Sequence, residues 1–377
     1  MRLFSLALVL VVALAGGAWW LSSSRARASD APPPADASGG ASGDAAPRDT
    51  TGSRRLRLRA VGDVMIGTDF PSARYLPPRG ASVLAGVHEM LRDADLTFAN
   101  LEGPFLDGGA SGKCRAGSTQ CYAFRTPTSY GRYLTDAGID LASVANNHAQ
   151  DFGEAGRTST MEMLDRLGIA HSGRAGTVAS VEKNGLRIAM IAYHTADHSN
   201  WVNDEPAAAR LVARVAESHD VVIVSFHGGA EGGRINVPQG RETFLGEDRG
   251  DLRLFTHTVV DAGADIVIGH GPHVPRGVEV YRGRLIAYSL GNFATYGRFT
   301  IRGATALAPL LEVEVGPDGA FEAGRILAAR QVGEGIPEAD PSGEVIRFMR
   351  DLSTEDFPAS EATVEADGRI VLRATAG

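Results

Sequence analysis

The chain has 377 residues, of which 44% are hydrophobic and 22% charged, and a formal net charge of −8 at pH 7. This composition is typical of a globular protein and excludes an intrinsically disordered chain. The chain is long enough for one large or two ordinary domains. The negative charge argues against nucleic acid or an anionic membrane surface as the main partner, but it leaves a small anionic substrate open, because a bound cation outweighs the overall charge locally.

Residues 1–28 are predicted to be an export segment outside the fold. An apolar run covers residues 3–21, and the Ala-Arg-Ala at residues 26–28 offers a cleavage site. The run is also long enough to span a bilayer, so a cleaved signal peptide and a retained membrane anchor both stay open. We expect the remainder to be exported: periplasmic, extracellular or anchored to the outer face of the membrane. Residues 29–53 lack a hydrophobic period and are predicted to be a flexible linker.

From residue 54 the sequence alternates β-rich runs with amphipathic helical segments, which indicates an α/β fold. In chain order we expect a strand at 56–63, a helix at 82–92, strands at 94–103 and 139–148 separated by a helix at 129–137, a helix at 153–167 that stops at Gly168, a strand at 186–194, a helix at 205–218, a strand at 221–229, a helix at 252–262, a strand at 264–271 and a hairpin at 277–293. Because hairpins intrude, the sheets should be mixed.

The domain prediction follows from this pattern. Residues 54–300 form the main domain, and residues 301–377 form a C-terminal β-rich extension of the same fold. Within the extension, residues 306–334 are predicted to be a β appendage and residues 341–353 a helix.

The sequence holds two cysteines, Cys114 and Cys121. In an oxidising compartment we expect a disulfide between them, and closing so short a loop would stabilise the fold by roughly 2–3 kcal/mol. Two free thiols are the alternative. A zinc site fits less well, because the spacing is not that of a zinc knuckle and no third ligand is near.

Polar side chains that bind metals stand where the predicted strands end. They are Asp63, Glu102, Asn147, His148, His227, His270 and His273. In open α/β sheets the ligand crevice lies outside the carboxyl ends of the strands, so we expect these side chains to converge. Each alone has a structural alternative, such as a turn or a loop acid, but their joint placement favours a metal site. Imidazole and carboxylate together suit one or two divalent ions, Mn, Fe or Zn.

Six segments occur in an order that resembles a known family. They are VGDVMIG, FANLEGP, SVANNHAQDFGEAG, VSFHGGAEG, DIVIGHGPHVPRGVE and IAYSLGNF. Together they resemble the capsule-synthesis family typified by CapA, the poly-γ-glutamate biosynthesis and export protein, which looks like a branch of the calcineurin-like metallophosphatases. The resemblance covers residues 56 to about 295. It implies a metallophosphatase-like α/β/β/α sandwich with mixed sheets.

The resemblance also implies a role for each residue. One metal would be held by Glu102, Asn147, His227 and His270, and the other by Asp63, Glu102 and His273. His148 would protonate the leaving group without binding metal. Asp151 would orient His148; the alternative is that it caps the helix from Gly153.

One position departs from the superfamily pattern. The first motif normally has a histidine two residues after its aspartate, but here that position is Met65, a poor ligand for a hard cation. The metal position served by Asp63 is therefore one ligand short. Phosphatase chemistry does not follow from the resemblance alone.

Substrate-binding candidates flank the last motifs. Arg276 could hold an anionic substrate as a bidentate fork, with a surface role as the alternative. Asn292 could project into the cleft or serve a turn. His194, Asp197 and His198 could extend the pocket, but a solvated loop is the favoured interpretation for them.

Three functions remain open on this basis. The first is an exported protein acting in biosynthesis, export or processing of an anionic capsular polymer such as poly-γ-glutamate, with a metal-dependent hydrolase-type site and membrane capsule-synthesis partners. The second is a secreted or anchored metal-dependent phosphatase or phosphodiesterase with a phosphoester substrate. The third is a non-catalytic polymer-binding protein on the same fold. No nucleic acid partner is expected.

Overall fold

The computed structural model describes residues 54–78, 82–114 and 121–374. The predicted export segment and linker lie outside these residues. Within the described part of the chain, no helix is long and apolar enough to cross a membrane.

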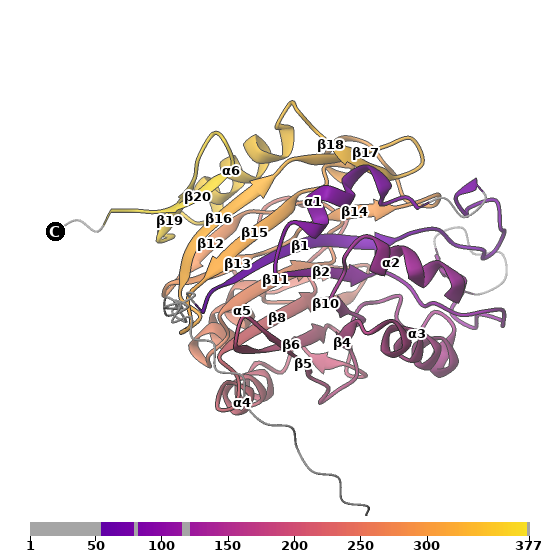
Figure 1. Cartoon of the computed structure of the whole chain (residues 1–377), viewed down its shortest axis with the longest axis horizontal. Helices are drawn as coiled ribbons and strands as arrows, with labels where there is room; N and C mark the ends of the chain where they lie inside the picture. Colours follow the sequence, from indigo (N-terminus) through magenta and orange to yellow (C-terminus); the bar gives the residue numbers. More distant parts are fainter. Residues whose placement is uncertain (1–53, 79–81, 115–120, 375–377) are drawn as a thin grey trace, which may run out of the picture. The chain divides into compact units, whose positions relative to one another are not determined.

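Two large mixed sheets form the framework (Figure 1). The first has the order β19-β20-β16-β15-β1-β2-β3-β4, with β14 pairing to β1. Its strands are β1 (Leu56–Met65), β2 (Leu96–Leu101), β3 (Leu141–Ser143), β4 (Ala170–Ser172), β14 (Asn292–Thr295), β15 (Leu310–Val315), β16 (Phe321–Leu327), β19 (Ala362–Val364) and β20 (Arg369–Leu372). Strands β1 to β4 and β14 run parallel to one another, whereas β15, β16, β19 and β20 pair in antiparallel fashion.

The second sheet has the order β12-β13-β11-β8-β6-β5, with β7 pairing to β6. Its strands are β5 (Ala179–Lys183), β6 (Leu186–His194), β7 (Asn200–Trp201), β8 (Val221–His227), β11 (Ile266–His270), β12 (Val278–Tyr281) and β13 (Arg284–Ala287). Two small ribbons accompany the sheets: β9 (Glu242–Phe244) with β10 (Glu247–Gly250), and β17 (Ala329–Val332) with β18 (Ile336–Ala339).

The strands are apolar on both faces because both faces are covered. In β6, Ile188 and Met190 belong to the core between the two sheets, whereas Ile191 and Tyr193 point to the opposite face. This alternation follows from the two-residue period of a strand, and a continuous apolar run is typical of a strand buried on both sides. The two sheets therefore pack face to face.

Helices cover the two outer faces. Helices α1 (His88–Arg92), α2 (Arg132–Asp136) and α3 (Gly153–Leu167) pack on the first sheet, and α4 (Glu205–Ala216) and α5 (Leu252–Asp261) pack on the second. Short 3-10 turns, Ala85–Val87 and Thr128–Gly131, precede α1 and α2, and a third spans Gly303–Ala306. The layers are thus α/β/β/α, as the resemblance implied.

Most predicted elements occur near their expected places, but the strand predicted at 139–148 is only β3, and the second arm of the predicted hairpin at 277–293 divides into β13 in the second sheet and β14 in the first. Helix α3 ends at Gly168, whose positive φ of 72° suits glycine. The helix predicted at 341–353 is α6 (Glu344–Asp356). The strands after residue 306 are more than an appendage, because β15 pairs with β1 along its length, in register from Leu56↔Val315 to Val61↔Leu310. The C-terminal residues therefore build part of the main sheet.

Candidate metal centre

The carboxyl ends of the central strands of both sheets meet at one edge. In Figure 1 this edge lies toward the right, where β14 joins the end of β1. The close approach of β14 requires Gly62, since a Cβ there would lie 1.9 Å from the Gly291 carbonyl oxygen. The Gly291 oxygen instead accepts a 2.8 Å hydrogen bond from the Asp63 amide. Asp63 and Asn292 are consequently register partners.

The second sheet contributes three histidines in one row. Strands β6, β8 and β11 are parallel neighbours, and their last residues, His194, His227 and His270, are in register. The rings of His194 and His227 have centroids 5.4 Å apart. All three imidazoles are buried.

Two carboxylates face this row from the first sheet. Asp63, Glu102 and His227 offer ligand atoms that all lie within 4.8 Å of one another. The Asn100 amide donates to Asp63 Oδ1 at 2.8 Å and to Glu102 Oε2 at 2.9 Å, which holds the two carboxylates together. Asn146 in turn donates to Asn100 Oδ1 at 3.1 Å. Both carboxylates of this cluster are therefore oriented by an amide.

The loop after β11 adds a fourth histidine. His273 has a positive φ of 61°, an uncommon conformation outside glycine. Its Nδ1 lies 2.9 Å from Asp63 Oδ2 and 3.1 Å from Asn292 Oδ1. His270 Nδ1 lies 3.6 Å from Asp63 Oδ1. His270 and His273 thus flank the same carboxylate.

The cluster perturbs the acid–base properties of its members. Burial opposes the charge of Glu102, but the attraction of His227, His148 and His273 outweighs it and holds the pKa of Glu102 well below its usual value. Burial lowers the pKa of His270 to about 4, despite the nearby Asp63. At His273 burial also opposes the charge, but the hydrogen bond and charge of Asp63 raise its pKa to about 9. The cluster therefore combines an ionised carboxylate with neutral imidazole at His270.

The donor set fits a divalent cation. Among the described residues, Glu102 Oε1, Asn147 Oδ1 and both ring nitrogens of His227 and His270 are buried without a hydrogen-bond partner. Such orphaned polar atoms are costly unless something binds them. Nitrogen and oxygen donors of this kind suit Mn, Fe or Zn. Met65 is buried at the end of β1. Its thioether sulfur is a poor ligand for a hard cation, so it does not replace the histidine that the superfamily pattern has at this position.

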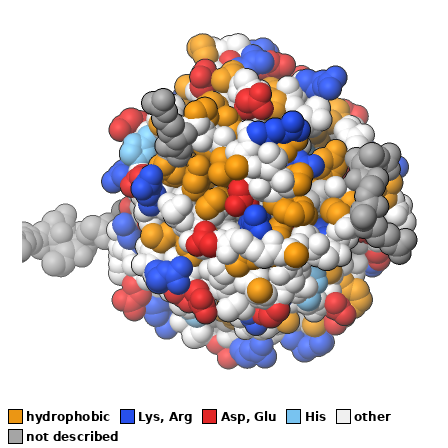
Figure 2. Space-filling view, turned by 90° about the vertical axis from the view of Figure 1, so that its right-hand side faces the viewer, with side chains coloured by type: hydrophobic (Ala, Val, Ile, Leu, Met, Phe, Trp, Pro, Cys, Tyr) orange, Lys and Arg blue, Asp and Glu red, His pale blue; other side chains and the backbone are white. Residues whose placement is uncertain are grey.

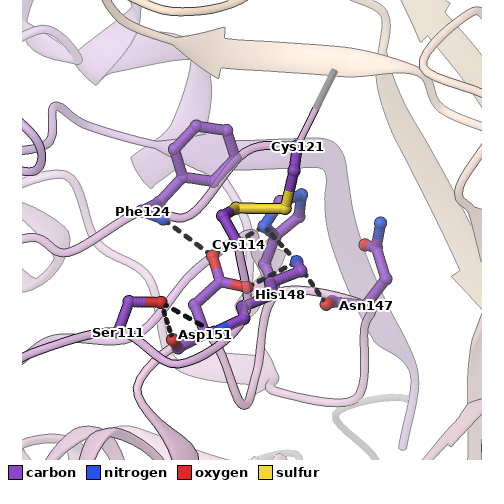
Figure 3. Close-up of a disulfide and its surroundings, with 8 residues drawn as sticks. Ser111, Cys114, Cys121, Phe124, Asn147, His148 and Asp151 are labelled. Atoms are coloured by element: carbon purple, nitrogen blue, oxygen red, sulfur yellow. Dashed lines mark hydrogen bonds and ion pairs between the residues drawn. A yellow bond between two sulfur atoms is a disulfide. The ribbon is translucent and has the colours of Figure 1, made fainter. Parts of the chain in front are cut away.

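His148 and Asp151 form a hydrogen-bonded pair beside the cluster (Figure 3). His148 Nδ1 lies 2.7 Å from Asp151 Oδ2, and His148 Nε2 lies 4.0 Å from Glu102 Oε1. Asp151 also accepts from the Phe124 amide at 2.7 Å and from Lys113 Nζ at 2.5 Å. The alternative role of Asp151 as a helix cap does not occur, because α3 has no side-chain cap.

A disulfide closes the segment next to this pair. Cys114 and Cys121 are bonded, with Cα atoms 5.6 Å apart, as Figure 3 shows. Lys113, immediately before Cys114, also donates to the Asn147 carbonyl at 2.9 Å. The cross-link therefore stands beside the residue that contacts Asp151.

A cavity of about 630 Å³ lies beside the cluster and meets it at His273. Its wall includes Lys113, Tyr122, Phe124, Asn147, His148, Glu231, Phe244, Leu245, Glu247, Arg249, His273, Asn292, Arg298 and Phe299. Phe124 and Phe299 stack with ring centroids 5.1 Å apart; Phe124 packs on His148 and Phe299 on His273. Figure 2, which faces the right-hand side of Figure 1, shows hydrophobic side chains gathered near the centre with charged ones among them.

Some sequence predictions need correction. Arg276 is fully buried, at 0% exposure, and its guanidinium pairs with Glu242 at 2.8 and 2.9 Å. Both predicted roles, substrate fork and surface residue, are therefore wrong, because no face of Arg276 remains free. His194 is not in a solvated loop either: it is buried, and burial followed by the charge of His227 lowers its pKa well below the usual value. His198 is half-buried, with its ring 5.6 Å from that of His194. Asn292 lines the cavity.

Three residues at the site were missed from the sequence. Asn100 stands two residues before Glu102, so the strand period puts both on one face, and this signal was available. Lys113 and Arg249 carry no local signal, since both reach the cavity through loops or ribbons placed by the whole fold.

Fold and site together define an α/β/β/α protein with a carboxylate–imidazole cluster at the carboxyl edge of its strands. The family described as "Bacterial capsule synthesis protein PGA_cap" matches residues 57–296. The chain belongs to this bacterial capsule synthesis family.

Curated relatives agree with this assignment. The chain is 26% identical over 271 residues to "Capsule biosynthesis protein CapA" of Bacillus anthracis, covering 66% of this chain and 62% of the relative. It is 29% identical over 256 residues to "PGA biosynthesis protein CapA" of Bacillus subtilis (strain 168), covering 63% of each. A "Probable polyglutamine synthesis accessory protein" of Mycobacterium tuberculosis is 27% identical over 278 residues, covering 65% of each. The chain thus spans less than two thirds of these relatives' length.

Similar solved structures are more distant. A 5'-nucleotidase precursor from Thermus thermophilus matches with a TM-score of 0.42 and 13% identity, covering 78% of this chain and 58% of that one. A purple acid phosphatase from yellow lupin seeds matches with a TM-score of 0.36 and 11% identity, covering 76% of this chain and 54% of that one.

Proposed function

We propose that the protein is exported and acts on an anionic capsular polymer such as poly-γ-glutamate, through a metal-dependent hydrolase-type site. Membership of the capsule synthesis family and the names of the curated relatives support the polymer. The observation that carries the chemistry is the buried cluster of Asp63, Glu102 and His227, whose ligand atoms lie within 4.8 Å of one another.

The metal ligands of this proposal come from the cluster. Glu102, Asn147, His227 and His270 would hold one cation, and Asp63, Glu102 and His273 would hold the other. A divalent ion bound there supplies Lewis-acid polarisation of the scissile group and acidifies water. The short ligand set at Asp63, with Met65 in place of histidine, makes its position the weaker of the two.

The remaining residues handle the proton and the substrate. Asp151 orients His148 through Nδ1, which favours the tautomer with its hydrogen at Nδ1 and directs Nε2 toward Glu102 and the cavity. When protonated, His148 can deliver a proton from Nε2 to the leaving group. Phe124 and Phe299 stack on each other in the cavity wall, next to His148 and His273.

The cross-link also supports export. A disulfide between Cys114 and Cys121 persists in an oxidising compartment and is rare in the cytosol. This agrees with the apolar run and cleavage site predicted within residues 1–28, and leaves cleaved signal and retained anchor as two forms of the same proposal.

A substrate panel tests the proposal. The purified full-length protein, supplied with Mn²⁺, is assayed on poly-γ-glutamate, p-nitrophenyl phosphate and bis-p-nitrophenyl phosphate, beside His148→Ala and His227→Ala. We expect cleavage of the polymer, lost in both variants and on chelation. Hydrolysis of the phosphate esters alone, abolished by His148→Ala, would establish a phosphoesterase instead. Polymer binding without hydrolysis of any substrate would establish a non-catalytic binder.

A further inference from the structure

A buried arginine, Arg249, forms part of the cavity wall. Arg249 lies in β10, is 1% exposed, and contributes to the cavity wall. Its Nε donates to the Gly229 carbonyl at 2.9 Å. The β10 strand pairs with β9, so the backbone on both sides of Arg249 is held by the ribbon.

The guanidinium of Arg249 is incompletely bonded. Its Nη2 is buried and has no hydrogen-bond acceptor among the residues that the structure describes. Glu231 Oε1 is 3.2 Å from Nη2, but outside hydrogen-bonding direction, and Glu247 Oε2 is 3.5 Å from Nη1. A buried guanidinium has five N–H donors, and leaving one unmet costs free energy. Arg249 therefore has capacity for a further oxygen ligand.

Glu231 sits where such a ligand would come. Its side chain is 22% exposed and also lines the cavity. Gly232 and Gly233 follow it with φ of 80° and 82°, a conformation that gives the chain a sharp bend here. A carboxylate that pairs poorly, next to two glycines, can be displaced by a better-placed oxyanion.

The loop that carries Glu231 is anchored at both sides. Arg276 donates to the carbonyls of Ala230 and Arg234, and Glu242 accepts from the Ala230 amide at 2.9 Å. This explains why Arg276 is buried and unavailable to substrate: it fixes the loop. Glu231, between the anchored positions, is left without a directed bond to Arg249.

We propose that Arg249 binds an oxyanion of the substrate beside the metal cluster, and that Glu231 occupies this position until the substrate displaces it. The ligand chemistry is a carboxylate or phosphate oxygen, which matches a guanidinium fork. This inference rests on the proposed function, under which the oxyanion is the free α-carboxylate of a γ-linked glutamyl unit adjacent to the scissile bond. Lys113 and Arg298, also in the cavity wall, add positive potential for neighbouring carboxylates.

Equilibrium binding tests the inference apart from catalysis. Isothermal titration calorimetry of the full-length protein uses two probes, γ-linked tetraglutamate and phenylphosphonate, each with excess EDTA and again with Mn²⁺. Arg249→Lys keeps the charge but removes the fork, so we expect its Kd to rise at least about tenfold. Glu231→Gln removes the competing carboxylate, so we expect its Kd to fall about three- to tenfold. Glu338→Gln, a change at an exposed acid on β18, is the matched control for net charge and should leave Kd unchanged.

The two variants are expected to change Kd in opposite directions, which separates a binding role of Arg249 from a structural one. If Arg249→Lys fails to fold, the tighter binding of Glu231→Gln still tests the inference. Effects seen with phenylphosphonate but not with tetraglutamate would support Arg249 as the oxyanion ligand and refute the polymer as substrate. Binding of neither probe, or a Kd that Glu231→Gln raises or leaves unchanged, would overturn the inference.

Discussion

Breaking the Cys114–Cys121 disulfide is predicted to lower the free energy of unfolding by about 2.5 kcal/mol. The two cysteines are seven positions apart in the chain, and the chain-entropy model for a loop of about eight residues yields this value at 25 °C. The cross-link also confines Lys113, which contacts Asp151. We therefore expect an additional local effect at the amide of Phe124, whose acceptor is Asp151.

The assay compares wild type with the double variant Cys114→Ser, Cys121→Ser by urea unfolding, with and without dithiothreitol. Only wild type should respond to the reductant, and reduced wild type should match the double variant. Hydrogen exchange at Phe124 should quicken in the double variant. An unfolding free energy that differs by less than about 0.5 kcal/mol between the two proteins would refute the entropic reasoning.

Further predictions concern residues away from the cluster. Burial raises the pKa of Asp265 to about 6, so the folded state keeps a proton that the unfolded chain releases near pH 4. The unfolding free energy of wild type relative to Asp265→Asn should therefore fall by up to about 3 kcal/mol between about pH 4 and 6.5. Urea unfolding at both pH values measures this, and a constant difference between the two proteins would contradict it. A Cβ at Gly269 would lie 2.3 Å from the Tyr288 carbonyl oxygen, whereas a Cβ at Gly112 would meet open space. Gly269→Ala should therefore lower the free energy of unfolding by about 2–4 kcal/mol, and Gly112→Ala should leave it almost unchanged. Equal melting temperatures of the two variants would contradict this. Arg276→Met should lower the free energy of unfolding by about 3–5 kcal/mol, because it leaves Glu242 buried and unpaired. Adding Glu242→Gln to this variant should restore part of the lost stability in the same thermal melts. If stability is not restored, the broken ion pair is not the cause of the loss.

The convergence of the strand-end side chains could be predicted because it depends on a general property of parallel strands. Strands β8 and β11 end at His227 and His270, and β1 carries Asp63 near its end. A local apolar run marks each strand, and the topology rule places their carboxyl ends together. No knowledge of side-chain packing was needed.

The two residues whose surroundings were predicted wrongly, His194 and Arg276, depend on strand register and on distant partners. His194 is followed by polar residues, so its surroundings in sequence favour solvent; it is buried because β6 pairs with β8 in a register that sets it beside His227. Arg276 is neutralised by Glu242, which lies on a ribbon 34 positions away in sequence. Such a pairing has no local pattern in either segment.

The role of the C-terminal strands had the same difficulty. The run that forms β15 predicts a strand by its alternation, but nothing within it indicates that it lies against β1, roughly 250 positions earlier. Hydrophobic periodicity defines a strand and leaves its neighbours in the sheet open.

Metal stoichiometry tests the central claim most directly. The full-length protein is loaded with Mn²⁺, freed of excess ion and subjected to elemental analysis. Wild type and His219→Ala should each retain at least one equivalent of bound Mn²⁺, and His227→Ala should lose it. His219→Ala is the control, because it changes a histidine at the opposite end of the β8 region. Equal metal content in all three proteins, or none in wild type after separate loading with Mn²⁺, Fe²⁺ and Zn²⁺, would contradict a cation site at the carboxyl edge of the sheets.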